Sequence, residues 1–475
     1  MKKLLIAILL LPAALAFAQA QTGTGTYDIR GFNAKGDGTH NDGPSFSAAV
    51  QAANRTGGTV ILPPGVYRFD SRIVLSNIKN VTIEGQDGAV ILKDGGAFVC
   101  THCSYVTIKN IGIQNRTVPK VVTVAELPTA NPKQIIVLDR HLTGFGYIPE
   151  PSDDGDAWAR MSPAQKAEAS SATTFASHIV FINSDHITVS GLHSVNKGFF
   201  GIYFDRCHDS EAINNTVIGG FPEAVPGAIA FVDATNDHGA LSYNNVADSN
   251  NISYAVHNGI LIYGGQHIRV TGNVVHDSSE TGIKIGQEDS RGSNFETYLT
   301  VSGNTSYRNH QEGFDLMEYY PPRGSDPAYS TATDNVSHDN DSQGIQVDGT
   351  HWTVTGNTIY SNQLSGLMID GENDVISNNV IYHNGLRAGT SNEVCYGCTS
   401  RSQTGNDVIT GNKIRSDHGN NYGIYIAHGN ASSTFSNNEV TGTTHTQEIW
   451  DVSSQRNVFT ANNGRIGGTA PFGKQ

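Results

Sequence analysis

Two charged residues hold the same place in two similar segments of the chain, Lys284 in Gly-Ile-Lys-Ile-Gly and Asp315 in Gly-Phe-Asp-Leu-Met. Acidic residues follow both, at Glu288 and Glu318. An amine with a lowered pKa can take a proton from carbon, while carboxylates can hold a cation or orient a substrate. We therefore expect Lys284 to act as a base, and Asp315 with Glu288 or Glu318 to form a cation- or substrate-orienting site.

The stretches that follow these two segments are longer than the equivalent stretches further along. Gly282–Asn304 and Gly313–Asn335 each advance 22 residues, whereas Gly344–Asn357 and Gly366–Asn379 each advance thirteen, so two neighbouring segments carry nine extra residues (22 minus 13). Two long loops side by side would form the walls of a groove, and aromatic rings and guanidinium groups suit sugar binding. The residues predicted to bind substrate are Arg291, Arg323, Tyr263, Tyr319, Tyr320 and Asp348.

A repeat must place these residues. An alternating strand, an Asn pair or Gly-Asn, a polar turn and a Gly-led second strand recur along the chain. Asn335–Gly344 and Asn357–Gly366 each advance nine residues, and the return of thirteen gives a coil of 22. That period fits a leucine-rich repeat or a β-helix. The helical leg of a leucine-rich repeat is missing, and asparagines at one turn of successive coils can stack, so the pattern predicts an all-β parallel β-helix.

In such a solenoid, equivalent positions of consecutive coils lie side by side. If the apolar residues of each second strand face the core, the residues between them face outward. Lys284 and Asp315 are then neighbours, roughly 5 Å apart. His276 and His338 share a column with Tyr307 and Tyr360, which favours a packing role over metal binding.

The predicted organisation is one domain behind a leader. A positive start, an apolar run and Ala18-Gln19-Ala20 predict a secretory signal peptide over residues 1–20, and hence a secreted or periplasmic protein. Residues 21–475 are predicted to form a single β-helix, capped by a helix over Ser45–Ala53. An insertion at about 117–177 breaks the repeat and is either a disordered excursion or a lobe over a groove.

Charge and cysteine content exclude some functions. The formal net charge of −14 argues against a nucleic-acid partner, and no later stretch is apolar enough to span a membrane. We expect a monomer. The pairs Cys100/Cys103 and Cys395/Cys398 lie many coils apart, too far to share one zinc ion, so local disulfides or isolated thiols are expected, with Cys207 buried.

The N-terminal part resembles the pectate-lyase-like superfamily of right-handed parallel β-helices. The matching residues are Phe32–Thr39, Asn41-Asp42, Gly57–Tyr67 and Val81–Gly85. Members include polysaccharide lyases, glycosidases, uronate epimerases and phage tailspikes, so the resemblance implies a fold and a polysaccharide partner more than a reaction.

A finer resemblance concerns the two charged strands. Thr281–Gly286 resembles the strand with the base lysine in family-nine pectate lyases, and Gly313–Leu316 resembles that family's calcium-site strand, although their order is reversed here. The resemblance implies a secreted lyase that cleaves a uronic-acid polymer by β-elimination, with Ca²⁺ as a possible cofactor. No other cofactor is expected.

Three alternatives remain open. A glycoside hydrolase needs two carboxyl groups across the scissile bond. A uronate C5-epimerase shares the first step of the lyase. A glycan-binding adhesin or spike needs no catalytic cleft. The candidate hydrolase carboxyl groups are Asp205, Asp233, Asp315, Glu318, Asp348 and Asp370.

Overall fold

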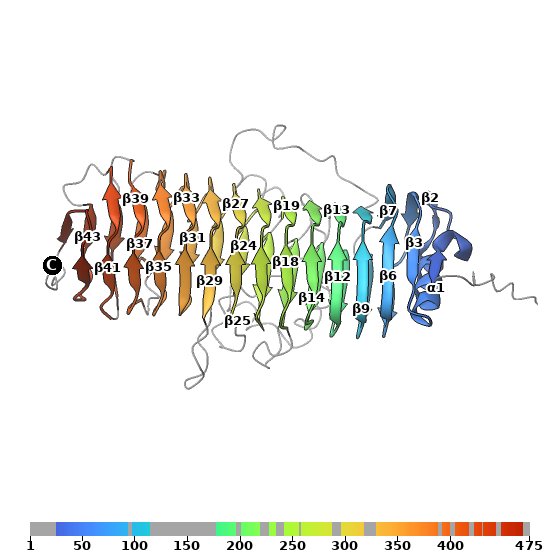
Figure 1. Cartoon of the computed structure of the whole chain (residues 1–475). Coiled ribbons are helices and arrows are strands. Elements are labelled where there is room, and N and C mark those ends of the chain that lie inside the picture. The colour runs from blue at the N-terminus through green and yellow to red at the C-terminus, as the bar shows by residue number, and fades with distance from the viewer. Residues whose placement is uncertain are drawn as a thin grey trace, which may run out of the picture.

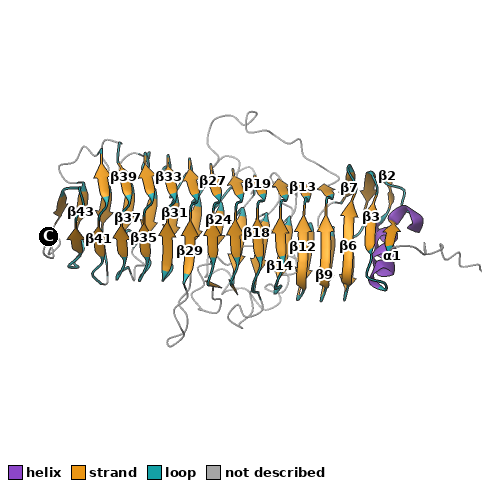
Figure 2. Ribbon diagram, viewed as in Figure 1, coloured by secondary structure: helices purple, strands orange, loops and turns teal. Residues whose placement is uncertain are grey.

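A computed structural model describes most of the repeat region. The described residues are 25–93, 97–114, 177–195, 201–218, 228–233, 242–255, 258–286, 296–317, 329–387, 392–399, 404–417, 422–429, 431–442 and 448–468. They form three long parallel sheets, here called sheets A, B and C, that run side by side along an elongated stack of coils (Figures 1 and 2). The right-handed parallel β-helix predicted from the repeat is thus confirmed.

Sheet A has fifteen strands. They are β1 (Thr26–Asp28), β3 (Thr59–Leu62), β6 (Lys79–Gly85), β9 (Ser104–Lys109), β12 (Asp185–Ser190), β15 (Glu211–Ile213), β18 (Val246–Asp248), β22 (Arg269–Thr271), β26 (Thr300–Ser302), β29 (Ser330–Thr333), β32 (Trp352–Thr355), β35 (Val375–Ser377), β38 (Val408–Thr410), β41 (Thr434–Ser436) and β44 (Val458–Thr460). A separate two-stranded pair joins β21 (Gly265–Gln266) to β25 (Glu296–Thr297).

Sheet B has fourteen strands. They are β2 (Asp37–Asn41), β4 (Gly65–Arg68), β7 (Ala89–Leu92), β10 (Gly112–Gln114), β13 (His193–Val195), β16 (Thr216–Ile218), β19 (Asn251–Ser253), β23 (Val274–His276), β27 (Thr305–Tyr307), β30 (Val336–His338), β33 (Thr358–Tyr360), β36 (Val380–Tyr382), β39 (Lys413–Arg415) and β42 (Glu439–Thr441).

Sheet C also has fourteen strands. They are β5 (Ile73–Ser76), β8 (Phe98–Thr101), β11 (Ile179–Ile182), β14 (Ile202–Asp205), β17 (Ile229–Val232), β20 (Ile260–Tyr263), β24 (Ile283–Ile285), β28 (Phe314–Leu316), β31 (Ile345–Val347), β34 (Leu367–Ile369), β37 (Val394–Tyr396), β40 (Ile424–Ile426), β43 (Ile449–Asp451) and β45 (Ile466–Gly468).

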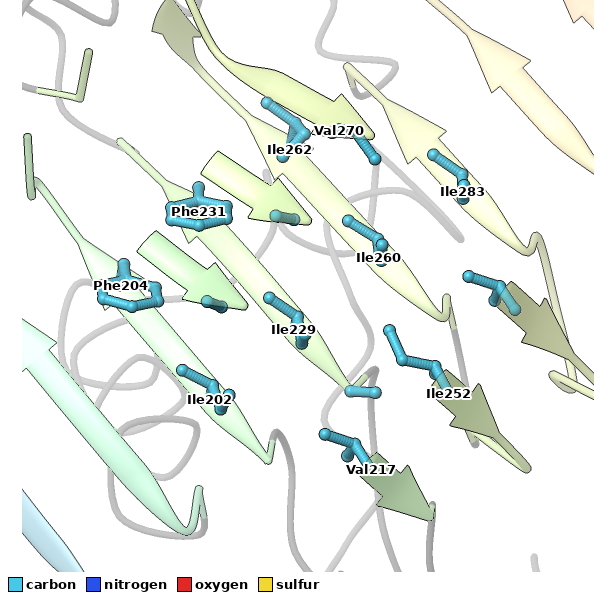
Figure 3. Close-up of a cluster of buried hydrophobic side chains, with 14 of the residues drawn as sticks. Ile202, Phe204, Val217, Ile229, Phe231, Ile252, Ile260, Ile262, Val270 and Ile283 are labelled. Atoms are coloured by element: carbon cyan, nitrogen blue, oxygen red, sulfur yellow. The ribbon is translucent and has the colours of Figure 1, made fainter. Parts of the chain in front are cut away.

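The core is a column of apolar side chains inside the coils. Every other residue of a strand points inward, so apolar residues stack on their equivalents in the next coil (Figure 3). Phe204, for example, stacks on Phe181 and Phe231 with ring centroids 5.6 and 4.7 Å apart. Because no coil can bury its apolar face alone, this stacking is what stabilises the fold.

Buried asparagines support the turns between sheets A and B. Nδ2 of Asn357 donates to Oδ1 of Asn379 at 2.9 Å, and Nδ2 of Asn379 donates in turn to Oδ1 of Asn412 at 2.9 Å. The same contact continues along one ladder, and a second ladder ends where Nδ2 of Asn384 donates to the buried carboxyl of Glu393. The Asn stacking predicted from the repeat is present and satisfies turn groups that would otherwise be buried without partners.

The N-terminal end of the stack is covered by helix α1 (Gly43–Asn54), which follows the short 3-10 helix η1 (Ile29–Phe32) (Figure 1). Phe46 and Val50 of α1 are fully buried against the first coils, so the predicted cap is present. The chain forms disulfides Cys100–Cys103 and Cys395–Cys398, and Cys207 is a buried free thiol. Within the described residues, no helix has both the length and the apolar character needed to cross a bilayer.

Candidate functional site

The outer face of sheet C carries the charged residues that the repeat predicts there. Lys284 of β24 pairs in register with Asp315 of β28, while their strand neighbours Ile283 and Leu316 lie in the core. Nζ of Lys284 lies 3.5 Å from Oδ2 of Asp315. The lysine side chain is 12% exposed and the aspartate side chain 7%. The structure therefore brings this pair together, in a sheltered rather than an open position.

Acidic neighbours fix the charge of the lysine. Burial alone lowers the pKa of Lys284, but the carboxylates of Asp315, Glu280 and Glu312 outweigh it, and its pKa is raised. Burial also raises the pKa of Asp315 well above its usual range, against the attraction of Lys284 and with help from Glu312 and Asp348. One ammonium group among several carboxyl groups therefore stays protonated, while Asp315 holds its proton more tightly than an exposed aspartate.

Two more aspartates extend this acidic region along the next coils. Asp348 follows β31 and Asp370 follows β34, at equivalent places on adjacent coils. Nε2 of Gln346 donates to Oδ2 of Asp348 at 2.6 Å, and a hydrogen bond of this kind stabilises a negative charge on the acceptor. The backbone N–H of Thr399 donates to Oδ1 of Asp370 at 3.1 Å. Burial nevertheless raises the pKa of Asp370 to about 7.

Two carboxyl oxygens in this region lack an internal partner. Oδ1 of Asp315 and Oδ2 of Asp370 are buried and accept no hydrogen bond within the part of the chain that the structure describes. Buried acceptors without partners are uncommon in folded proteins and recur at catalytic and binding sites. Both atoms are therefore candidates for contact with a proton, a water molecule or a ligand.

The disulfide Cys395–Cys398 lies beside Asp370. Cys395 pairs in register with Met368, two residues before Asp370, and Cys398 immediately precedes the Thr399 whose N–H binds the carboxyl. The cross-link therefore constrains the short turn that holds Asp370. Of the two expectations for these cysteines, a local disulfide or isolated thiols, the structure has the disulfide, and its place beside Asp370 was not predicted.

An apolar patch borders the charged region on its N-terminal side. Ala230, Val232 and Leu261 form a second buried cluster outside the main core, and Tyr203 and Tyr263 pack against it. Tyr263, predicted to bind substrate, thus lies on the same face of sheet C, one coil before Lys284.

Several predicted features lie outside the described residues. They are Glu288, Arg291, Glu318, Tyr319, Tyr320, Arg323, the signal peptide at 1–20 and the insertion at 117–177 up to its last residue, Ser177. Their proposed roles stay predictions.

No calcium site is identified among the described residues. Calcium takes six to eight oxygen ligands, and the described ranges contain no group of three or more His, Cys, Asp or Glu residues arranged to hold a metal ion. The involvement of calcium therefore stays a prediction, and no step below depends on it.

Some residues of the site were not found from the sequence. Glu280 and Glu312 precede the strands and act on Lys284 across the bend, and Glu312 also accepts from Thr281 Oγ1 at 3.0 Å. Trp450 of β43, an outward residue of sheet C in register with Tyr425, was also missed, because its strand lacks the preceding glycine that marks the other second strands. Alignment by coil register, rather than by that glycine, would have found it.

The histidines of sheet B pack as the sequence predicts. His276, Tyr307, His338 and Tyr360 stack with centroids 4.7 to 4.9 Å apart, and Nδ1 of His338 lies 2.7 Å from Oδ2 of Asp339. Their ring faces cover one another from coil to coil. This column is a packing ladder on the side of the solenoid formed by sheet B.

Comparison with known families agrees with this architecture. Residues 27–146 match the family described as rhamnogalacturonase A/epimerase, pectate lyase-like; residues 232–394 match the periplasmic copper-binding protein NosD; and residues 343–465 match the right handed beta helix region. Each match covers less than half of the chain, and together they confirm the resemblance to pectate-lyase-like parallel β-helix proteins.

Individual relatives are distant. Alginate lyase 7 of Azotobacter vinelandii is 40% identical over 68 residues, which are 14% of this chain and 7% of that protein. The Siphovirus 9NA tailspike receptor binding domain has a TM-score of 0.58 at 16% identity, covering 88% of this chain and 73% of that chain. The Agl-KA catalytic domain has a TM-score of 0.53 at 14% identity, covering 94% and 68%. These structural likenesses establish the fold alone.

Proposed function

We propose that the protein is an exported enzyme that hydrolyses a polysaccharide lying along the outer face of sheet C. The observation that carries this proposal is the run of Asp315, Asp348 and Asp370 over three consecutive coils. Asp315 and Asp370 have raised pKa values and each has a buried oxygen without a partner among the described residues. Glycoside hydrolysis needs one carboxyl group that is protonated near working pH and a second that is ionised.

In the proposed reaction, two of these groups have roles. Asp370, with its pKa near 7, would donate a proton to the leaving glycosidic oxygen as the bond to the anomeric carbon breaks. Asp348 lies one coil away, with its backbone about 5 Å along the stack, and its charge is among the causes that raise the pKa of Asp370. Carboxyl groups on adjacent coils suit a retaining pair better than an inverting pair, whose carboxyl groups stand further apart. The carboxylate of Asp348 would attack the anomeric carbon to form a glycosyl ester. Asp370 would then take a proton from the water that hydrolyses this ester.

The remaining charges favour a neutral glycan. Lys284 is the one cation that the described part of this face places among Asp315, Glu280 and Glu312. The excess of carboxyl groups makes the local potential unfavourable for a polymer with a carboxylate on every sugar. The whole chain has a formal charge of −14, which acts in the same direction.

β-Elimination on a uronic-acid polymer is the second candidate. The short match to an alginate lyase and the position of Lys284 beside Asp315 favour it. A lyase base must be free to accept a proton, however, and the raised pKa of Lys284 favours its charged form. In this reaction Lys284 would therefore stabilise the developing enolate rather than abstract the proton.

The test is turnover of defined polymers by the purified protein. Xylan, galactomannan, β-glucan, polygalacturonate and alginate are each incubated with the wild type, with Asp370→Asn and with Asp87→Asn, an exposed control. If the protein is a hydrolase, the wild type should produce new reducing ends without absorbance from unsaturated uronate. Asp370→Asn should lose this activity, and the control Asp87→Asn should keep it. Unsaturated products would identify a lyase, an altered uronate ratio without cleavage an epimerase, and binding without turnover a spike or adhesin.

Export is a separate part of the proposal. Cleavage of the predicted signal peptide would give a mature N-terminus near Gln21 and a protein outside the cytoplasm. Mass spectrometry of the protein recovered from the periplasm or medium checks this, and recovery of the uncleaved chain in the cytoplasm would contradict it.

A further inference from the structure

The outer face of sheet C carries an aromatic cluster beyond the acidic region. Tyr425 of β40 and Trp450 of β43 pair in register, and both side chains are partly exposed. The ring of Tyr422 lies 5.9 Å from that of Tyr425 and 5.4 Å from that of Trp450, at interplanar angles of 24° and 14°. Three nearly parallel rings therefore form one platform on the same face as Asp370.

Small residues flank this platform along the stack. Cys395, which is bound to Cys398, precedes Tyr425 in the column, and Gly467 follows Trp450. The rings of the platform stack on one another, as do the rings of the sheet B ladder at 4.7 to 4.9 Å. In the column of sheet C, however, the positions before and after Tyr425 and Trp450 carry no ring, so the aromatic column ends there on both sides.

Between the platform and the acidic region, the outer face of sheet C carries small side chains. The positions equivalent to Asp370 in the next two coils are Gly397 and Ala427. Neither carries a side chain large enough to interrupt a ligand that lies along the sheet. Tyr425 and Trp450 stand two and three coils beyond Asp370, or about 10 and 14 Å along the stack. That distance exceeds one sugar ring, so a ligand touching both places would be an oligosaccharide.

We infer that Tyr422, Tyr425 and Trp450 form a glycan subsite that binds a sugar ring of the polymer two to three coils from the acidic residues. An aromatic face offers a flat apolar surface to the C–H groups of a pyranose ring, and its edge leaves the hydroxyl groups in water. The inference extends the proposed function, since it assigns the direction of the bound chain along the solenoid, from the acidic region toward the C-terminal coils.

The subsite can be tested without turnover. Asp370→Asn is applied to an array of xylan, galactomannan, β-glucan, polygalacturonate and alginate, and the same variant carrying Trp450→Ala or Tyr425→Ala is compared with it. Removal of either ring is expected to weaken binding at least tenfold. The matched control Tyr105→Ala removes an exposed ring from sheet A and should leave binding unchanged. Trp450→Phe, which keeps a ring, should restore most of the affinity and guards against a folding defect.

Turnover then separates the two proposals. In an active protein, Trp450→Ala should raise KM for the polymer with little change in kcat, because the ring lies away from the reacting bond. If the protein cleaves no polymer but binds one in a way that depends on Trp450, the subsite is supported and the proposed hydrolysis is wrong. Equal binding by Trp450→Ala, Tyr425→Ala and their parent, or no binding of the parent to any polymer, would overturn the subsite.

Discussion

At the scale of single residues, the charge state of each acidic group decides the chemistry. Lys284 sits beside Asp315 at 3.5 Å, but its carboxyl neighbours raise its pKa. Asp370 instead combines burial, a pKa near 7 and a buried oxygen without a described partner. The environment of these side chains therefore favours a carboxyl group over the lysine as the group that exchanges protons.

Asp370→Asn tests that assignment. Asparagine keeps the size of the side chain and cannot donate the proton, so kcat should fall by about 10²–10⁴-fold. In the wild type, Asp370 must be protonated for the first step, so activity should decline as pH rises through about 7. A pH series of kcat/KM for both proteins measures this decline. If the residual activity of Asp370→Asn declined with rising pH as the wild type does, Asp370 would not be the general acid.

Lys284→Met tests whether the lysine is a base. The long apolar side chain of methionine fills most of the same volume without a charge, and loss of the ammonium removes the attraction that opposes protonation of Asp315. We expect partial loss of activity, with the alkaline limb of the pH profile still set by Asp370. Complete loss at every pH, with a normal melting temperature, would instead favour Lys284 as the essential base.

At the scale of the structural element, the turns depend on buried amides. Asn378 and Asn379 are adjacent, but Asn378 is exposed with φ of 55° whereas Asn379 is fully buried and binds Asn412 and the carbonyl of Val354. The left-handed conformation suits asparagine at the first position, and the ladder requires its amide at the second.

The same substitution at these two positions should separate the roles. Asn379→Asp removes two donated hydrogen bonds and buries a carboxyl group, which should lower the free energy of unfolding by about 2–4 kcal/mol. Asn378→Asp keeps an exposed, turn-compatible side chain and should change it by less than about 0.5 kcal/mol. Urea denaturation of both variants measures the difference. Equal stability of the two variants would contradict a stabilising role for the asparagine ladder.

The coil could be predicted from the sequence because the advance of nine residues from Asn to Gly recurs from coil to coil. Matching the Gly-led strands that begin at Gly282 and Gly313, 31 residues apart (313 minus 282), places Lys284 next to Asp315. The charge states of Lys284 and Asp315 could not be predicted from the repeat. Glu280 and Glu312 lie before the strands, where side-chain direction follows the bend rather than strand alternation. Trp450 stands in a coil whose spacing departs from the repeat.

At the scale of the whole molecule, the solenoid buries acidic groups as well as apolar ones. Burial raises the pKa of Glu393, at the end of the second asparagine ladder, to about 7, and that of Asp407 likewise to about 7. At these two groups the folded protein holds more protons than the unfolded chain between about pH 4.5 and 7. Their contribution to the free energy of unfolding therefore falls as pH rises through this window and levels off above it.

Glu393→Gln tests the linkage. Glutamine has no charge to bury, so at pH 8 the variant should be more stable than the wild type by up to about 3 kcal/mol. At pH 4.5 both proteins carry a neutral group there, and the difference should nearly vanish. Urea midpoints at the two pH values measure it, and a difference that grows toward acid pH would contradict the raised pKa.

The outer faces of sheets B and C differ in their side chains. Sheet B carries a histidine–tyrosine ladder that packs on itself, whereas sheet C carries apolar, acidic and aromatic regions in sequence along one face. A linear face of this kind matches a linear ligand, since each coil can meet a successive part of a polymer. The proposed hydrolysis and the aromatic subsite both require the glycan to lie along that face.

The most direct test of this claim is a crystal structure of Asp370→Asn with an oligosaccharide released from the polymer that the wild type cleaves. The account predicts sugar rings along the outer face of sheet C, with a glycosidic oxygen beside residue 370 and a ring against Tyr425 or Trp450. A glycan seated on sheet A or sheet B, or across the coils rather than along them, would contradict it.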